Sequence, residues 1–543
     1  MTNFRVSQGP STDRLSTRDT KIPSFVIHLL ATVGIAFILY RLREFAIDDA
    51  FIHRRIAAHL LDTGYGFFNA HERVMVTSSP LWTILLAGII ATGHVDILVP
   101  ILEAICIVLS CSVAWQLGCR AAATQGVRYP KLIGAAAALI TFCALLQSGV
   151  AQMEAPLAIG LFLLGILLFD VGAQSWLAVL VLATTVRYEF YLLLPVVGVV
   201  ALLQRKLTWK AIAYASVTLA LSIGWLLFQY GTIVPNTVKA KAIGYDLPFT
   251  ETMYMVGLGR GVIVALLLVV AWMIINRKRL PVSAVLLFTF GILLCAAYVS
   301  RRTFVFSWYQ PLTRIPLMLG LLLGPALAAR SWIKLLPVSL VLFLFLRNIK
   351  APGEEVLAAL TGQPWRNQVD NFNLRVFDYL ATGRAINRAC PRAKLLTSEI
   401  GALGYAFPGE ILDGFGLATP AALKWHPMKV PEQRANGGLG AIPAGFFAET
   451  HPDIVVTFPV FSEDLMRHYN PSDYELVTFP ALREIGAQLH PGPKVAVDEA
   501  TLIVLIAKTG ACSVDELKPV LNASLRASDE SIWGDLPASQ IPH

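Results

Sequence analysis

Long apolar segments alternate with short polar loops along the first two thirds of the chain. An α-helix that crosses a bilayer needs about 20 apolar residues. The segments that come close to this length are 23–42, 100–119, 132–150, 154–171, 211–230, 255–275, 281–299 and 310–328. Shorter apolar stretches are 79–93, 176–187, 189–204 and 335–347. This pattern predicts a polytopic α-helical membrane protein with residues 23–349 as its transmembrane domain.

Basic residues in the polar loops predict which ends of these segments face the cytoplasm. The tail 1–22 is basic and has no cleavable signal pattern, so we expect it in the cytoplasm. Further basic clusters lie at 120–131, 205–210, 277–279 and 330–334. All of them face inside if 176–187 and 189–204 each cross the membrane and 79–93 does not. We therefore expect about 11 transmembrane helices, with 13 as the alternative, and a C-terminal domain outside the cytoplasm.

The pattern changes at about residue 350, where charged residues become more frequent and the apolar runs shorten. A helical stretch, 367–387, comes first. The runs of strand length are 393–399, 409–414, 453–459, 474–480 and 501–508. They predict an extracytoplasmic α/β domain over residues 350–543. The tail after about residue 522 is rich in Ser, Asp and Pro, and we expect it to be loosely ordered.

The composition supports the membrane assignment and argues against other classes. Of the 543 residues, 55% are hydrophobic and 15% are charged, whereas about a quarter of a soluble domain is charged. The net charge of +8 fits basic cytoplasmic loops and contacts with lipid phosphates better than nucleic-acid binding. The chain has no Walker-type or dinucleotide-binding glycine motif.

The seven cysteines fall into two groups. Those in or beside apolar segments are expected to be small buried hydrophobes, and they are Cys106, Cys111, Cys119, Cys143 and Cys295. Cys390 and Cys512 lie in the C-terminal region. A disulfide between them fits an extracytoplasmic location for that region. No CxxC or His-rich spacing indicates a zinc site.

Ionisable residues gather in the loops that the predicted topology places outside. The first outer loop, 43–79, contains IDDAFIHRR at 47–55. The other outer loops contain SGVAQMEAP (148–156), RYE (187–189), YGTIVPNTVKAK (230–241) and RRTFVFSWYQP (301–311). Ionisable groups next to apolar spans are functional candidates by default. Their gathering on one side of the membrane predicts a site there.

Asp48 and Asp49 have two interpretations. Asp is a preferred N-cap, so the pair can begin an interfacial amphipathic helix over 49–61 whose Arg54 and Arg55 touch lipid phosphates. Alternatively, one carboxylate is a general base and the basic residues bind a phosphate. The two roles are compatible, because one Asp can cap the helix while the other reacts.

The polar residues next to the middle spans also have two interpretations each. Glu154 is either a helix-terminal charge or a second carboxylate of the site. Arg187 either forms an ion pair with Glu189 or binds the donor of a reaction.

The polar residues of the later outer loops also have two interpretations each. Lys239, Lys241 and Arg302 are either anchors at the lipid surface or ligands of a donor phosphate. Tyr309 belongs either to an interfacial aromatic belt or to a surface that binds sugar or phosphate.

Residues 48–82, DDAFIHRRIAAHLLDTGYGFFNAHERVMVTSSPLW, resemble the first outer loop of a family of polytopic bacterial glycosyltransferases. That family includes the mycobacterial terminal β-(1→2) arabinofuranosyltransferases. The segment 230–241 is similar to the family's YGxxxPNTxxAK element, and ILDGFGLATP (411–420) to its VIDLxGLxD segment. SGVAQMEAPL (148–157) is similar to the family's SGLET element but is shifted by an insertion. VRYEFYLLL (186–194) is similar to RPEGLLLL with substitutions within the motif.

This resemblance implies the GT-C fold and a polyprenyl-phosphate sugar donor such as decaprenyl-phosphoryl arabinose. It implies inverting transfer of D-arabinofuranose to a hydroxyl of a cell-envelope glycan, outside the bacterial plasma membrane. The catalytic residues would be Asp48, Asp49 and Glu154. The donor-binding residues would be Arg55, Arg187, Asn236, Lys239, Lys241, Arg302 and Tyr309. Lys and Arg can serve a monophosphate leaving group, so no metal is required, with a divalent cation on the acid pair as the alternative.

Two other functions stay open as alternatives. A related transferase would move another sugar onto a protein such as a pilin, or onto a lipid. A lipid-linked glycan transporter should show inverted halves and charges near the middle of the membrane. Here the polar motifs gather on the outer face beside a large outer domain, which favours an enzyme.

Overall fold

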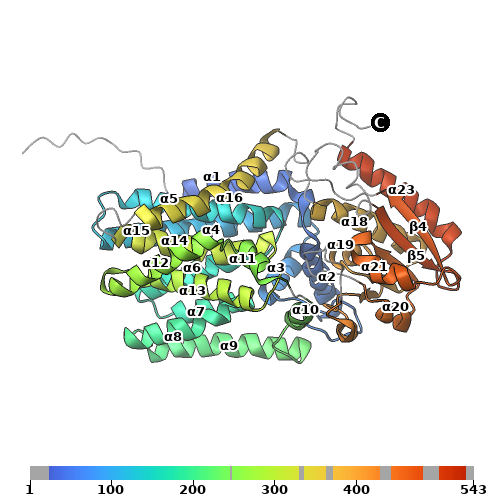
Figure 1. The fold of residues 1–543 in the computed structure, drawn as a ribbon, viewed down its shortest axis with the longest axis horizontal. Coiled ribbons are helices and arrows are strands. Elements are labelled where there is room, and N and C mark those ends of the chain that lie inside the picture. The colour runs from blue at the N-terminus through green and yellow to red at the C-terminus, as the bar shows by residue number, and fades with distance from the viewer. Residues whose placement is uncertain are drawn as a thin grey trace, which may run out of the picture.

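The computed structural model describes residues 24–244, 247–328, 335–361, 371–428, 442–480 and 501–533. A helical part, built from the first two thirds of the chain, lies beside a smaller part that contains the only sheet among these residues (Figure 1). The predicted cytoplasmic tail and the basic cluster at 330–334 lie outside the described residues.

The helices of the helical part follow the predicted apolar segments. They are α1 (Ser24–Arg41), α4 (Val95–Thr124), α5 (Pro130–Val150), α6 (Ala155–Val171), α7 (Trp176–Thr184), α8 (Leu193–Leu203), α9 (Trp209–Tyr230), α12 (Arg260–Ile275), α13 (Val282–Ser300), α14 (Gln310–Leu323), α15 (Pro325–Ala328) and α16 (Leu335–Thr361). Close packing depends on glycine at some crossings. A Cβ on Gly320 of α14 would lie 2.5 Å from the backbone nitrogen of Phe288 on α13.

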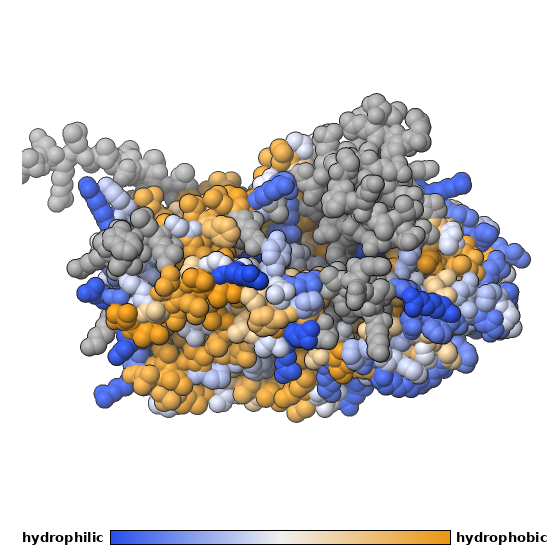
Figure 2. All heavy atoms as spheres, in the orientation of Figure 1, coloured by the Kyte–Doolittle hydropathy of each residue, from blue (hydrophilic) through white to orange (hydrophobic). Residues whose placement is uncertain are grey.

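Several helices have the length and hydropathy of membrane spans. Among the described residues these are α4, α5, α9 and α13, and a fifth if α11 (Phe249–Met255) and α12, which are bent by 71°, form one span. Apolar side chains cover much of the surface of the helical part, whereas the sheet part is largely hydrophilic (Figure 2). The described residues thus contain four or five helices that could cross a membrane, as expected of a helical membrane protein, and the number of about 11 crossings stays a prediction.

The sheet part contains all five predicted strands. They are β1 (Leu395–Thr397), β2 (Ile411–Asp413), β3 (Ile454–Thr457), β4 (Tyr474–Pro480) and β5 (Thr501–Ala507), in the order β2-β1-β3-β5-β4. Strand β1 is parallel to β2 and β3, while β5 is antiparallel to β3 and β4. The accompanying helices are α18 (Asn371–Ala389), α19 (Gly401–Ala406), α20 (Ala444–Thr450), α21 (Pro459–His468) and α23 (Val514–Trp533).

The C-terminal segment differs from its prediction. A loosely ordered tail was expected from about residue 522, but α23 continues to Trp533. Its apolar face explains the difference, because Leu517, Leu521 and Leu525 recur at helical spacing and are buried. Residues after 533 lie outside the described part of the chain.

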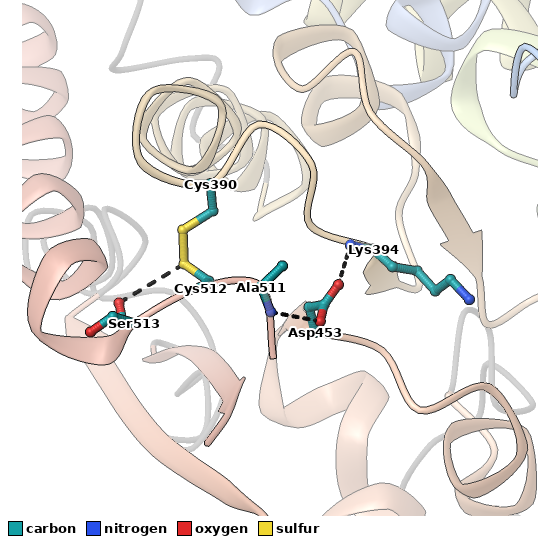
Figure 3. Close-up of a disulfide and its surroundings, with 6 residues drawn as sticks. All are labelled: Cys390, Lys394, Asp453, Ala511, Cys512 and Ser513. Atoms are coloured by element: carbon teal, nitrogen blue, oxygen red, sulfur yellow. Dashed lines mark hydrogen bonds between the residues drawn. A yellow bond between two sulfur atoms is a disulfide. The ribbon is translucent and has the colours of Figure 1, made fainter. Parts of the chain in front are cut away.

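A disulfide joins Cys390 and Cys512, whose Cα atoms lie 5.5 Å apart (Figure 3). Asp453 holds the two neighbouring segments together, because its carboxylate accepts hydrogen bonds from the backbone N–H of Lys394 at 2.8 Å and of Ala511 at 3.0 Å. The other five cysteines are free. The bridge therefore fixes the end of α18 beside the start of α23.

Helix α2 (Asp48–Thr63) lies at the junction of the two parts, next to α19 (Figure 1). Its residues 50–57 are all buried, and Arg54 and Arg55 are only 7% and 3% exposed. Of the two interpretations of this segment, the one of an interfacial helix whose arginines touch lipid phosphates is therefore wrong. Helix α3 (Pro80–Ile90), in the segment expected not to cross, has only 11 residues.

Candidate active site

The acid pair occupies the first turn of α2, but Asp48 caps a different helix. Its Oδ2 accepts a hydrogen bond from the N–H of Gly401 at 2.9 Å, and its Oδ1 accepts one from Ala402 at 2.7 Å. These are the first N–H groups of α19, which have no partner within their own helix. Gly401 is required here, because a Cβ would lie 1.8 Å from the carbonyl oxygen of Asp48.

The surroundings of Asp48 raise its pKa to about 7. Removal of the carboxylate from water is the largest cause, and the nearby negative charge of Glu399 is the second. The hydrogen bonds from Ala402 and Gly401 act in the opposite direction. Asp48 is therefore poised to exchange a proton near neutral pH.

Asp49 is linked to a tyrosine and a lysine from two other elements. Lys241, on α10 (Asn236–Gly244), donates to Tyr309 Oη at 3.0 Å. The hydroxyl of Tyr309, in the 3-10 helix η4 (Ser307–Tyr309), lies 3.4 Å from Asp49 Oδ2. The lysine and the carboxylate are thus connected through the tyrosine. Tyr309 is buried rather than part of an exposed aromatic belt.

A cavity of about 80 Å³ lies at this junction between the helical and the sheet part. Asp48, Asp49, Lys241 and Glu399 contribute its charged groups. Its aromatic walls include Phe306, Trp308, Phe415 and Phe461. An apolar wall around a few charged groups is typical of a ligand site.

Glu399 and Arg375 belong to this site and were not predicted. Arg375 on α18 makes two hydrogen bonds to Glu399, from Nε to Oε2 at 2.9 Å and from Nη2 to Oε1 at 2.8 Å. A signal for Glu399 was present, since this residue is the last of the predicted first strand, 393–399. Polar residues at the carboxyl end of a parallel strand are frequent ligand contacts. Nothing in the local sequence marks Arg375.

Glu154 and Arg187 form a buried ion pair network behind the cavity. Arg187 Nη1 donates to Glu154 Oε1 at 2.5 Å, and Nε donates to Glu189 Oε2 at 3.0 Å. The Tyr298 hydroxyl donates to Glu189 Oε1 at 2.9 Å. The guanidinium of Arg187 also lies 4.2 Å from the ring centre of Tyr309. The interpretation of Arg187 as an ion-pair partner of Glu189 is confirmed, while its binding of a donor stays a prediction. The guanidinium of Arg187 packs against the ring of Tyr309.

Three other predicted donor-binding residues bind backbone carbonyls instead of lining the cavity. Arg55 donates to the carbonyls of Phe68, Gly404, Phe407 and Gly409. Asn236 donates to the carbonyls of Gly416 and Leu417, both at 2.8 Å. Arg302 donates to that of Leu247 at 2.5 Å. The first two connect the helical part to the sheet part.

The predicted residues therefore separate into three sets. Asp48, Asp49 and Lys241 line the cavity, Tyr309 links Lys241 to Asp49, and Glu154 and Arg187 form the ion pair network next to Tyr309. Lys239 is exposed on α10, away from the cavity lining, and Arg55, Asn236 and Arg302 hold loops in place. Among the described residues, no group of three or more His, Cys, Asp or Glu side chains is arranged to hold a metal ion.

No protein-family model matches the chain, and no curated protein matches it significantly.

Proposed function

We propose that this protein is a membrane glycosyltransferase of the GT-C type that uses a polyprenyl-phosphate sugar donor. One observation carries the proposal: the junction cavity brings two adjacent carboxylates of α2 together with Lys241 and with Glu399 of the sheet part. A base and a cation facing one small space suit transfer of a sugar from a phosphate to a hydroxyl.

The reaction needs a base for the acceptor hydroxyl. Its oxygen bonds to the anomeric carbon while the bond from that carbon to the phosphate oxygen breaks, with inversion. The proton of the hydroxyl passes to Asp48, whose pKa of about 7 matches a base that works near neutral pH. The two N–H groups of α19 hold this carboxylate in one orientation.

The leaving group gains negative charge on its phosphate as the bond to the sugar breaks. Lys241 donates a hydrogen bond to Tyr309, whose hydroxyl in turn lies next to Asp49. The ammonium of Lys241 stabilises the negative charge of the leaving phosphate. Asp49 and the buried Arg187 fix Tyr309 between them. In this division of roles Asp48 serves the acceptor, and Asp49 orients the groups that bind the donor.

The identity of the sugar rests on the resemblance of 48–82 and 230–241. It favours D-arabinofuranose from decaprenyl-phosphoryl arabinose, transferred to a cell-envelope glycan. The Cys390–Cys512 disulfide supports a location of the sheet part outside the plasma membrane, since disulfides persist in oxidising compartments. The acceptor glycan would reach the cavity from that side.

The test is sugar transfer by the purified full chain, supplied with polyprenyl-phosphoryl arabinose and arabinan acceptors. We expect Asp48→Asn to lower the rate by about 10²-fold or more, and Lys241→Met to lower it strongly. Lys239→Met is the matched control, because this exposed lysine on the same helix lies outside the cavity lining, and it should keep the wild-type rate. Wild-type rates in both Asp48→Asn and Asp49→Asn would show that the catalytic assignment is wrong.

A further inference from the structure

A second cavity, of about 700 Å³, lies on a different face of α2 from the proposed active site. Its α2 residues are Phe51 and Arg54, whereas the first cavity uses positions 48, 49 and 52. The second cavity is also bounded by α18, α19, α23 and the start of α4. We call it the arginine cavity, after its lining residues Arg43, Arg54, Arg384 and Arg388.

Small side chains on α23 create the space. This helix contributes Ala523, Ser524, Ala527 and Ser528 to the lining. Ser524 Oγ also donates to the carbonyl of Ala381 at 2.9 Å, which holds α23 against α18. The two helices are thus fixed next to each other while their small residues leave room for a ligand.

The arginine cavity carries an excess of positive charge. Among the described residues, four arginines line it together with two carboxylates, those of Glu44 and Asp96. Glu44 forms an ion pair with Arg43, with 3.4 Å between Oε1 of Glu44 and Nη2 of Arg43. Within the described part of the chain, Arg54, Arg384 and Arg388 have no ion pair with a carboxylate. A buried arginine without a carboxylate partner is costly unless an anion completes the site.

Arg54 is the buried member of this set, and it is held in place. Its guanidinium donates to Gln152 Oε1, and Gln152 Nε2 donates to the carbonyl of Arg43 at 2.7 Å. The ring centre of Phe51 lies 4.9 Å from the guanidinium carbon. Gln152 has a φ of 59°, which is uncommon for a residue other than glycine. The backbone thus adopts an unfavourable conformation at the residue that positions Arg54.

The arginine cavity lies at the ends of two apolar helices. Arg43 lies two residues after the end of α1, which exposes Phe25, Leu30 and Phe37 on its surface. Asp96 is in the first turn of α4, one of the candidate spans. If α1 and α4 both cross the membrane, their ends place the cavity near the lipid headgroups.

We propose that the arginine cavity binds a phosphate group, carried by a lipid headgroup at the membrane surface or by a soluble phosphate ester. The planar guanidinium fork matches phosphate oxygens, and several arginines can share one phosphate. The position at the end of two apolar helices favours the lipid headgroup. A ligand here would join α2 of the helical part to α18 of the sheet part. The proposal is independent of the transferase function, because the two cavities share no lining residue.

The test compares lipid binding by the full chain in detergent, measured by native mass spectrometry with added phosphatidylglycerol or phosphatidylcholine. The key variant is Arg384→Gln with Arg388→Gln, because both side chains are exposed and their loss should leave the fold intact. We expect wild type to prefer phosphatidylglycerol, and the variant to bind it about tenfold more weakly. Arg392→Gln with Arg526→Gln is the matched control, since these exposed arginines do not line the cavity and should have no effect.

Binding of glycerol 3-phosphate, measured in the same way, distinguishes a lipid headgroup from a soluble phosphate ester. Binding of the lipid alone, with the stated dependence on Arg384 and Arg388, identifies a headgroup site. Binding of glycerol 3-phosphate with the same dependence identifies a phosphate site that is filled from solution. The proposal is overturned if wild type and the key variant bind phosphatidylglycerol equally well. It is also overturned if the control variant loses as much phosphatidylglycerol binding as the key variant.

Discussion

Asp48 connects parts of the chain that are 353 residues apart in sequence. Its carboxylate accepts hydrogen bonds from two backbone N–H groups of α19, while Asp48 itself is the first residue of α2. The capping interpretation and the catalytic interpretation of this residue are therefore compatible. The helix that Asp48 caps belongs to the sheet part, which no pattern within residues 43–61 could have predicted.

The raised pKa of Asp48 predicts a pH-dependent stability. Its folded value of about 7 exceeds the value of about 4 expected in the unfolded chain. The folded protein therefore binds this proton more tightly, and the resulting stabilisation is full below about pH 4 and is lost as the pH rises through about 7. Thermal unfolding of the wild type between pH 5 and 8 should show this loss, and Asp48→Asn should reduce it.

Glu399→Gln provides a second variant for this prediction. Because the charge of Glu399 raises the pKa of Asp48, its removal should move the loss of stability to lower pH. In the transfer assay the same change should extend activity to lower pH, since Asp48 must be deprotonated to act as a base. Identical pH profiles for wild type, Asp48→Asn and Glu399→Gln would contradict the assignment.

Among the elements, α2 differs most from what its sequence suggests. Its stripe of apolar residues and its charged residues allowed the interpretation of a helix on the membrane surface, but residues 50–57 are all buried within the protein. Two of its charged residues, Asp48 and Arg55, bind backbone groups of residues 401–409. By contrast, the strands and most apolar helices were predictable, because each is marked by its own local run of residues.

The close approach of α2 and α19 predicts that Gly401→Ala is destabilising. A methyl group would meet the backbone of Asp48, so the two helices must separate. We expect a loss of about 3 kcal/mol or more in the free energy of unfolding, together with loss of the proposed activity. Gly353→Ala in α16 is the control, because a Cβ there meets nothing within 4 Å. Unfolding midpoints that are the same for Gly401→Ala and wild type would show that this contact does not hold the two helices together.

For the whole molecule, the side of the membrane on which the sheet part lies is a testable expectation. A cysteine introduced at exposed Ser472, in the sheet part, should react with a membrane-impermeant maleimide in intact cells. A cysteine at exposed Arg128, between α4 and α5, should react only after the cells are opened. The opposite pattern would reverse the predicted orientation.

The position of α2 also has a consequence for biosynthesis. The residues that bind Asp48, and three of the four whose carbonyls bind Arg55, are translated about 350 residues later, which takes roughly 20 to 70 s at typical rates of synthesis. Until then Asp48 lacks these two hydrogen bonds and Arg55 has only nearby partners such as the carbonyl of Phe68, so α2 must remain hydrated or be protected by other factors. Asp48 and Arg55 therefore reach their final arrangement only after residues 401–409 have been made, and shorter products do not contain the assembled junction.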